Sequence, residues 1–318
     1  MRLIDLHCDT IWELMKRQDG HLDSNTCCVD VGKLQQAGGI AQFFACFIHM
    51  DNFQGDERFT NAYVSALEMI KFAKKEFLAV SDKLVLARSY EEFLENKDQG
   101  ILSAFLTIEE GGILDCDWNR LQRLYEEGVR LMTLTWNYEN CIGYPNSREE
   151  SIMQKGLKPF GIEVVERMNT MGMIVDVSHL SDGGFWDVIK YSKKPIVASH
   201  SNARALCPHP RNLSDEMIRA LSDNGGIAGL NLYPFFVRSD GVITAEHVAD
   251  HLYHMYQVGG EDVLAIGTDF DGFDEGVSEI AHMGEMGLLY ETMRRKGFSE
   301  RQMEKIWYGN AMRIIKEL

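Results

Sequence analysis

Short apolar runs alternate with amphipathic stretches along the chain. Eight runs have the length and composition of buried β-strands: Leu3–His7, Ala41–Ile48, Leu102–Ile108, Leu131–Thr135, Met173–Ser178, Pro195–Ser199, Gly226–Leu232 and Val263–Thr268. The stretches between them have helical spacing, as in Asn61–Phe77, Trp118–Glu127, Lys158–Met171 and Glu246–Val258. Apolar strands separated by helices indicate a parallel sheet covered on both faces. Eight such units are the count of a (β/α)8 TIM barrel, so we expect an α/β protein of that fold.

We find no internal repeat, low-complexity tract or flexible linker in the 318 residues, so the sequence predicts one catalytic barrel domain over residues 1–318. The formal net charge of −16 argues against binding to nucleic acid or to an anionic membrane, because both need basic patches. No signal peptide precedes the first strand, and the most apolar run, Ile40–Ile48, is too short to cross a bilayer. The seven cysteines are an odd, scattered set typical of reduced thiols, so we expect a cytoplasmic protein.

Polar residues follow the carboxyl ends of the predicted strands. They are His7 and Asp9, Glu109 and Glu110, Trp136, His179, His200, Tyr233, and Asp269 and Asp271. Histidine ends three of these strands although the chain has only 10 histidines. Because the active sites of such barrels lie at the carboxyl ends of the strands, this placement predicts a metal centre there. The other histidines, to which we assign no role, are His21, His49, His209, His247, His251, His254 and His282.

The candidate ligands are too many for one tetrahedral zinc ion and divide naturally between two. His7 and Asp9 share one face of an extended strand and would hold the first ion. His179 and His200, on adjacent strands, would hold the second, and Glu110 could bridge both through its two oxygens. Paired ions share a water molecule and convert it to hydroxide near neutral pH, so the expected reaction is hydrolysis of an amide or ester.

Asp269, on the last strand, has no obvious ligand duty and is placed to move a proton from the water to the leaving amine. Asp271 faces the same side if the strand continues, so the choice between the two stays open.

The chain resembles the membrane dipeptidase (renal dipeptidase) family, peptidase family M19. The matching segments, in the family's order, are LIDLHCDT, IEEGG, LTWN, DVSHLS, PIVASHSNARAL, HPRNLSDE, GLNLYP and GTDFDG. They span essentially the whole chain, and their combination is highly specific. The resemblance implies a binuclear zinc dipeptidase on a (β/α)8 barrel and suggests a homodimer. It implies metal ligands at His7, Asp9, Glu110, His179 and His200, with the catalytic acid–base at Asp269.

The resemblance also implies residues that bind the substrate. The family's substrate arginine corresponds to Arg211, which suits a free carboxylate because a guanidinium offers a bidentate fork; Arg204 is its rival. Tyr233 resembles a substrate-contacting tyrosine. Where renal-type enzymes carry a histidine after the fourth strand, this chain has Trp136, whose indole can donate a hydrogen bond but cannot donate a proton.

We therefore expect a zinc dipeptidase that hydrolyses small dipeptides, with L,D-dipeptides among the candidate substrates, and that needs no nucleic acid or membrane. The first alternative is another binuclear amidohydrolase, acting on a cyclic amide, lactone or phosphoester. A non-catalytic metal-binding or scaffold protein is the second alternative, and the intact ligand set together with Asp269 argues against it.

Overall fold

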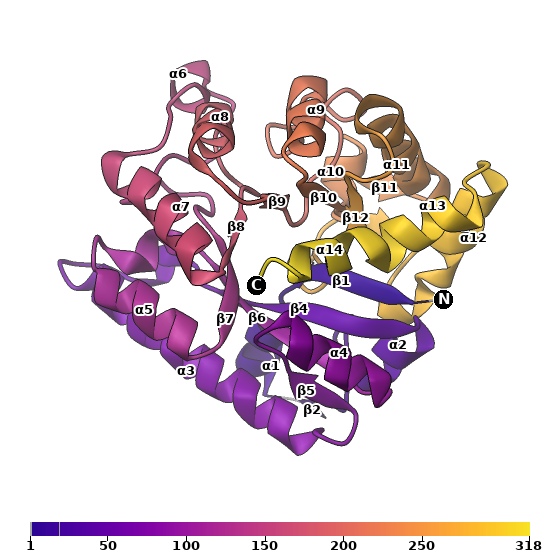
Figure 1. Cartoon of the computed structure of the whole chain (residues 1–318), viewed down its shortest axis with the longest axis horizontal. Coiled ribbons are helices and arrows are strands. Elements are labelled where there is room, and N and C mark those ends of the chain that lie inside the picture. Colours follow the sequence, from indigo (N-terminus) through magenta and orange to yellow (C-terminus); the bar gives the residue numbers. More distant parts are fainter. Residues whose placement is uncertain (1, 19) are drawn as a thin grey trace.

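The computed structural model describes residues 2–18 and 20–318. Eight parallel strands form a closed barrel, in agreement with the predicted fold (Figure 1). In chain order they are β1 (Leu3–Cys8), β4 (Gly39–Phe47), β6 (Leu102–Glu109), β7 (Val129–Thr133), β8 (Ile174–Asp176), β9 (Val197–Ala198), β10 (Ile227–Leu230) and β12 (Leu264–Ile266). Each predicted strand is present, with ends shifted by up to a few residues. Strand β4 pairs with both β1 and β6, and this pairing closes the ring.

The remaining strands are short additions to the barrel. Strand β5 (Leu84–Leu86) pairs with the start of β6. Strands β2 (Gly20–His21) and β3 (Ser24–Asn25) pair antiparallel. Strands β11 (Val242–Ile243) and β13 (Val277–Ser278) form a separate parallel pair in the loops that follow β10 and β12.

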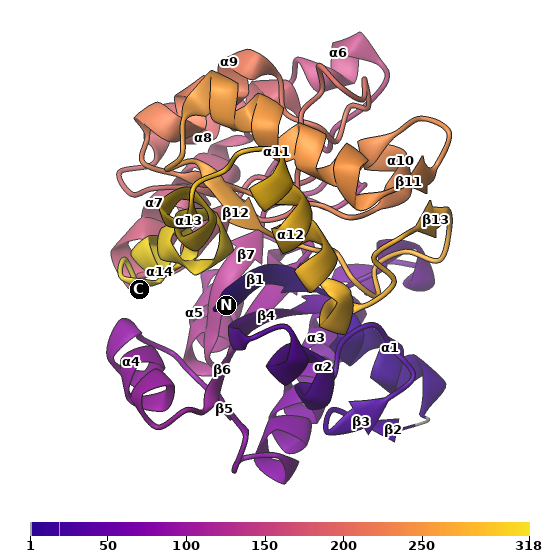
Figure 2. The same cartoon turned by 90° about the vertical axis from the view of Figure 1, so that its right-hand side faces the viewer.

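Helices surround the barrel (Figures 1 and 2). They are α1 (Thr10–Arg17), α2 (Val31–Gln36), α3 (Arg58–Ala79), α4 (Tyr90–Asp98), α5 (Trp118–Glu126), α6 (Glu150–Met153), α7 (Pro159–Met171), α8 (Asp182–Tyr191), α9 (Asp215–Asp223), α10 (Pro234–Val237), α11 (Ala245–Gly259), α12 (Gly287–Arg295), α13 (Glu300–Glu304) and α14 (Asn310–Ile315). Serine side chains at the N-caps of α4, α8 and α9 accept hydrogen bonds from first-turn amides, which fixes where these helices begin. Among the residues that the structure describes, no helix has both the length and the apolar character needed to span a lipid bilayer.

Two buried clusters form the core. The larger lies between the strands and the surrounding helices, and the smaller fills the barrel. In the smaller cluster Phe43 and Phe105 stack with ring centroids 4.7 Å apart. Helix α14 contributes Ala311, Ile314 and Ile315 to this cluster, so the amino-terminal end of the barrel is packed with apolar side chains. The opposite end, where the strands finish, is left for polar residues.

Candidate metal centre and active site

Five side chains converge at the carboxyl ends of the strands. His7 Nε2 lies 3.2 Å from Asp9 Oδ2 and 3.3 Å from Glu109 Oε2. The other carboxylate oxygen of Glu109, Oε1, lies 3.0 Å from His179 Nε2 and 3.6 Å from His200 Nε2. The two Nε2 atoms of His179 and His200 are 3.0 Å apart. All five residues are buried.

Glu110, predicted to bridge two ions, lies outside this cluster, and Glu109 occupies the central place instead. The carboxylate of Glu110 accepts hydrogen bonds from the backbone N–H of Gly112 at 2.7 Å, from Asn140 Nδ2 at 2.6 Å and from the backbone N–H of Trp136 at 2.9 Å. These three donors tie together the loops after β6 and β7. Burial, only partly offset by the three donors, raises the pKa of Glu110 to about 7.

The alternation of side chains along β6 explains which glutamate faces the site. Phe105 belongs to the cluster inside the barrel, whereas Leu106 and Ile108 belong to the cluster outside it. With a period of two, Glu109 points inward and Glu110 does not. Once the inward direction of Phe105 is known, the even spacing from Phe105 to Glu109 identifies Glu109 as the inward glutamate.

Three further side chains orient the histidines from behind, a role that the sequence analysis assigned to none of them. Ser199 Oγ lies 2.7 Å from His200 Nδ1 and donates to Asp176 Oδ2 at 2.6 Å. His179 Nδ1 lies 3.0 Å from Asn137 Oδ1. Since both acceptors require an N–H at Nδ1, each imidazole turns an unprotonated Nε2 toward the cluster.

The donor set fits divalent metal ions. Burial, reinforced by the charge of Arg211, lowers the pKa of His179 to about 4, and burial also holds the pKa of His200 well below its usual value. Two neutral Nε2 lone pairs and a carboxylate oxygen therefore face one another without a proton between them, which is unfavourable unless a cation sits among them. Ligand atoms around a tetrahedral zinc ion lie about 3.4 Å apart, and the observed separations are close to that value. Buried Asp9 Oδ1 and His7 Nδ1 also lack hydrogen-bond partners among the described residues.

Burial and neighbouring charges shift the pKa values of Asp9 and His7. Burial, with the charges of Glu109 and Asp269 beside it, raises the pKa of Asp9 to about 7. Burial opposes the charging of His7, but Glu109 and Asp9 outweigh it and raise the pKa of the imidazole. Two groups of three residues bring atoms that could bind a metal within 4.8 Å of one another. The first is His7, Glu109 and His200, and the second is His7, Asp9 and Asp269. Such a concentration of buried charge and lone pairs is typical of a metal centre.

The structure separates the roles of Asp269 and Asp271. Asp269 Oδ1 lies 3.8 Å from His7 Nε2, and Asn231 Nδ2 donates to its Oδ2 at 2.8 Å. Burial raises the pKa of Asp269 to about 6. Asp271 instead accepts from Thr10 Oγ1 at 2.6 Å and from the backbone N–H of Cys28 at 2.7 Å, so it ties two loops together away from the cluster.

Backbone strain gathers at the same rim. Asp269 and His179 have φ angles of 62° and 67°, and Glu110 and Asp271 have φ angles of 103° and 67°. Non-glycine residues with positive φ cost energy and cluster at functional sites. Two glycines permit the close packing beneath, because a Cβ would lie 1.9 Å from Ser199 O at Gly229 and 1.7 Å from the same oxygen at Gly267.

The two candidate arginines differ in their partners. Arg204 forms a bidentate ion pair with Asp182, with N–O distances of 2.7 and 2.8 Å. Its guanidinium is therefore already paired within the protein. Arg211 is buried next to the cluster and donates to His200 O at 3.0 Å and to Ser201 Oγ at 3.2 Å. Its Nε has no hydrogen-bond partner among the described residues, so donor capacity remains.

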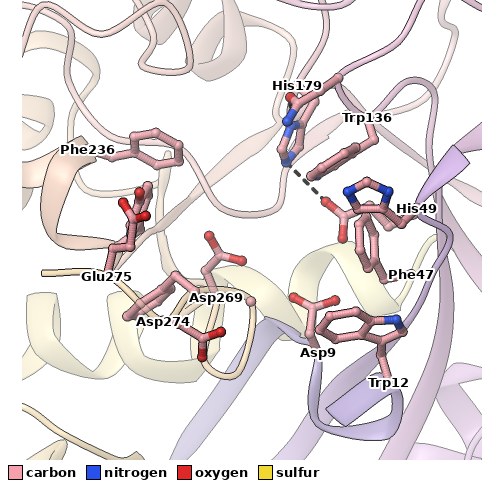
Figure 3. Close-up of a pocket in the computed structure, with 15 residues that line it drawn as sticks. Asp9, Trp12, Phe47, His49, Trp136, His179, Phe236, Asp269, Asp274 and Glu275 are labelled. Carbon is pink, nitrogen blue, oxygen red and sulfur yellow. Dashed lines mark hydrogen bonds and ion pairs between the residues drawn. The ribbon is translucent and has the colours of Figure 1, made fainter. Parts of the chain in front are cut away.

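A cavity of about 410 Å³ opens above the cluster. Figure 3 shows Trp12, Phe47, His49 and Trp136 on one side of it and Phe236 on the other, with Asp9 and Asp269 between them. The two further predicted substrate residues, Trp136 and Tyr233, both line this cavity. Arg211 is not a lining residue, but its guanidinium packs on the ring of Phe236, 5.3 Å from the centroid.

Comparison with known proteins identifies the family of the chain. The model of the membrane dipeptidase family (peptidase family M19) matches residues 1–318. The chain belongs to this family. An uncharacterised Klebsiella pneumoniae protein encoded in the pqqA 5′ region is 32% identical over 255 residues, which cover 77% of this chain and 93% of the relative.

Two solved metallopeptidases share the whole fold. A family M19 metallopeptidase described as dipeptidase AC superposes with a TM-score of 0.91 at 26% identity, covering 100% of this chain and 98% of that one. A metallopeptidase from Rhodobacter sphaeroides, solved with a phosphinate mimic of the dipeptide L-Ala-D-Ala, superposes with a TM-score of 0.89 at 24% identity, covering 100% of this chain and 99% of that one. The present M19 member is thus a metal-dependent hydrolase, a dipeptidase.

Proposed function

We propose that this dipeptidase holds two zinc ions and uses them to hydrolyse the peptide bond of free dipeptides. The observation that supports two ions is the position of Glu109. Its Oε2 faces His7 and Asp9, while its Oε1 faces His179 and His200. One carboxylate can therefore serve two adjacent ligand sets.

In this proposal His7, Asp9 and Glu109 hold one ion, and His179, His200 and Glu109 hold the other. Such ions lower the pKa of a water molecule and polarise the carbonyl under attack. The chain contributes the orientation of the ligands, because Ser199, Asp176 and Asn137 keep the Nδ1 atoms of the second pair of histidines protonated.

Asp269 is the proposed proton carrier. Its pKa of about 6 lets it gain and lose a proton near neutral pH, and Asn231 fixes one of its oxygens. It would take the proton of the attacking water and deliver it to the nitrogen of the leaving amino acid.

Arg211 is the proposed partner of the substrate's terminal carboxylate. It is buried at the Phe236 side of the cavity and has an unused N–H. A carboxylate paired with this guanidinium places the scissile bond over the metal ligands, so a longer peptide, whose chain continues at that point, would be excluded.

We further propose that the accepted dipeptides include those with a D-residue at the carboxyl terminus. This is supported by the Rhodobacter sphaeroides relative, whose bound ligand mimics L-Ala-D-Ala. The test is a panel of L,L- and L,D-dipeptides assayed with zinc-loaded protein, together with elemental analysis. Absence of hydrolysis across the panel, or one ion per chain at saturation, would contradict the proposal.

A further inference from the structure

His49 stands on the cavity wall although the sequence indicated no role for it. It lies two residues beyond the end of β4, and the backbone there is fixed: Ile48 N–H donates to the carbonyl of Glu109 at 3.1 Å. The carbonyl of His49 in turn accepts from Asn52 N–H at 3.0 Å. By the alternation along the strand, His49 shares the inward face with Phe47. Its position is therefore tied to the strand that carries the central carboxylate.

The imidazole of His49 is held by rings rather than by polar partners. Its centroid lies 5.1 Å from that of Trp136, 6.0 Å from that of Phe47 and 6.2 Å from that of Tyr138. Figure 3 shows the rings of Trp136 and Phe47 beside it. Its Nδ1 is buried and has no hydrogen-bond partner among the described residues. A buried polar atom without a partner lowers stability, so its presence calls for an explanation.

The position of His49 relates it to one end of the substrate, and this step depends on the function proposed above. With the terminal carboxylate at Arg211, on the Phe236 side, the amino-terminal residue lies against the opposite wall. That wall is formed by Trp12, Phe47, His49 and Trp136 (Figure 3). Trp12, Phe47 and Trp136 offer aromatic surface and at most an indole N–H donor. His49 is the side chain of the four whose ring nitrogens can accept as well as donate a hydrogen bond.

We propose that His49 is a specificity-determining residue. It hydrogen-bonds the side chain of the dipeptide's amino-terminal residue and thereby favours side chains with an amide, hydroxyl or carboxylate over apolar side chains of the same size. An aromatic wall alone would favour the apolar side chain.

The test uses substrates matched in size, Asn-Gly with Leu-Gly and Gln-Gly with Met-Gly, on zinc-loaded protein. One hydrogen bond changes kcat/KM by about 3- to 10-fold, so replacement by phenylalanine (His49→Phe) should lower the Asn/Leu and Gln/Met ratios by that factor. His49→Gln keeps a hydrogen-bonding group and should restore much of each ratio. Binding of phosphinate analogues of Asn-Gly and Leu-Gly, measured by calorimetry, should show the same change without turnover.

Phe47→Leu is the matched control, since it alters packing on the same wall without removing a polar group and should not lower the Asn/Leu or Gln/Met ratio. If His49→Phe lowers kcat/KM for both members of a pair equally, His49 contacts the peptide backbone or amino group and the specificity proposal is wrong. If the zinc-loaded wild-type protein hydrolyses none of the four dipeptides, the zinc-dependent hydrolysis proposed above itself fails. Hydrolysis with unchanged ratios overturns only the role of His49.

Discussion

Replacing Glu109 by glutamine should weaken the binding of both metal ions, whereas the same change at Glu110 should weaken the binding of neither. The two residues are neighbours in sequence, but only Glu109 places its carboxylate 3.0 to 3.6 Å from histidine nitrogens. The carboxylate of Glu110 is bound to Gly112, Trp136 and Asn140 instead. Comparing Glu109→Gln with Glu110→Gln therefore makes the same chemical change at two positions, of which only one faces the histidines.

The expected size of the effect follows from the charge removed. Two unit charges 4 Å apart attract by about 4 kcal/mol at an effective dielectric constant of about 20. If half of this survives desolvation, each ion binds about 30-fold more weakly, because 1.4 kcal/mol is tenfold. The Glu110→Gln protein should keep both metal ions. Its new amide NH2 group would face one of the three hydrogen-bond donors, and this lowers the free energy of unfolding by about 1–3 kcal/mol.

The assay is elemental analysis after dialysis against buffers of fixed free zinc concentration, with thermal unfolding followed in parallel. Asp9→Asn and His179→Asn provide comparisons, since each removes a ligand from one side of Glu109 and should weaken one ion more than the other. Full metal content in Glu109→Gln, or loss of metal in Glu110→Gln, would refute the reasoning.

Three other predictions follow from the site. Asp269→Asn should retain metal but lower kcat by about 10²- to 10⁴-fold, and comparable activity would move proton transfer to another group. Arg211→Ala should weaken hydrolysis of a free dipeptide by about 2–5 kcal/mol yet barely affect the carboxyl-amidated dipeptide, while Arg204→Ala should not discriminate between them; equal losses for both substrates would make Arg211 structural. Glu110, with its pKa raised to about 7 from 4.5, binds a proton more tightly in the folded protein, so its contribution to stability should be lost as pH rises through that interval. The difference in Tm between metal-free wild type and Glu110→Gln should therefore shrink from about pH 5 to about pH 8, and a constant difference would contradict this.

Much of the fold was readable from the order of apolar runs. Eight buried strands separated by amphipathic helices can satisfy their backbone hydrogen bonds in few other ways, and the strand ends then meet at one rim by topology alone. This is why His7, Asp9, His179, His200 and Asp269 could be assigned to one site before their distances were known.

The exchange of Glu109 for Glu110 shows where motif reading stops. Both residues are glutamates at the end of the same strand, and only the inward phase of Phe105 distinguishes them. In β1 the alternation of side chains does not by itself show which residues face the barrel interior, because the pairing of β1 with β4 shifts register between Asp5 and Cys8. Ile4 and Leu6 face the barrel interior, and it is this irregularity that also brings His7 into the site.

Contacts between segments far apart in the chain were decided by the tertiary structure alone. Ser199 links Asp176 to His200 by hydrogen bonds. Arg204 is paired with Asp182, and Asp271 accepts a hydrogen bond from Thr10. A local pattern carries residue type and phase, so it determined the fold and the kinds of ligand. Which carboxylate is free to bind a cation depends on which other donors reach it first, and those donors come from loops that only the closed barrel brings together.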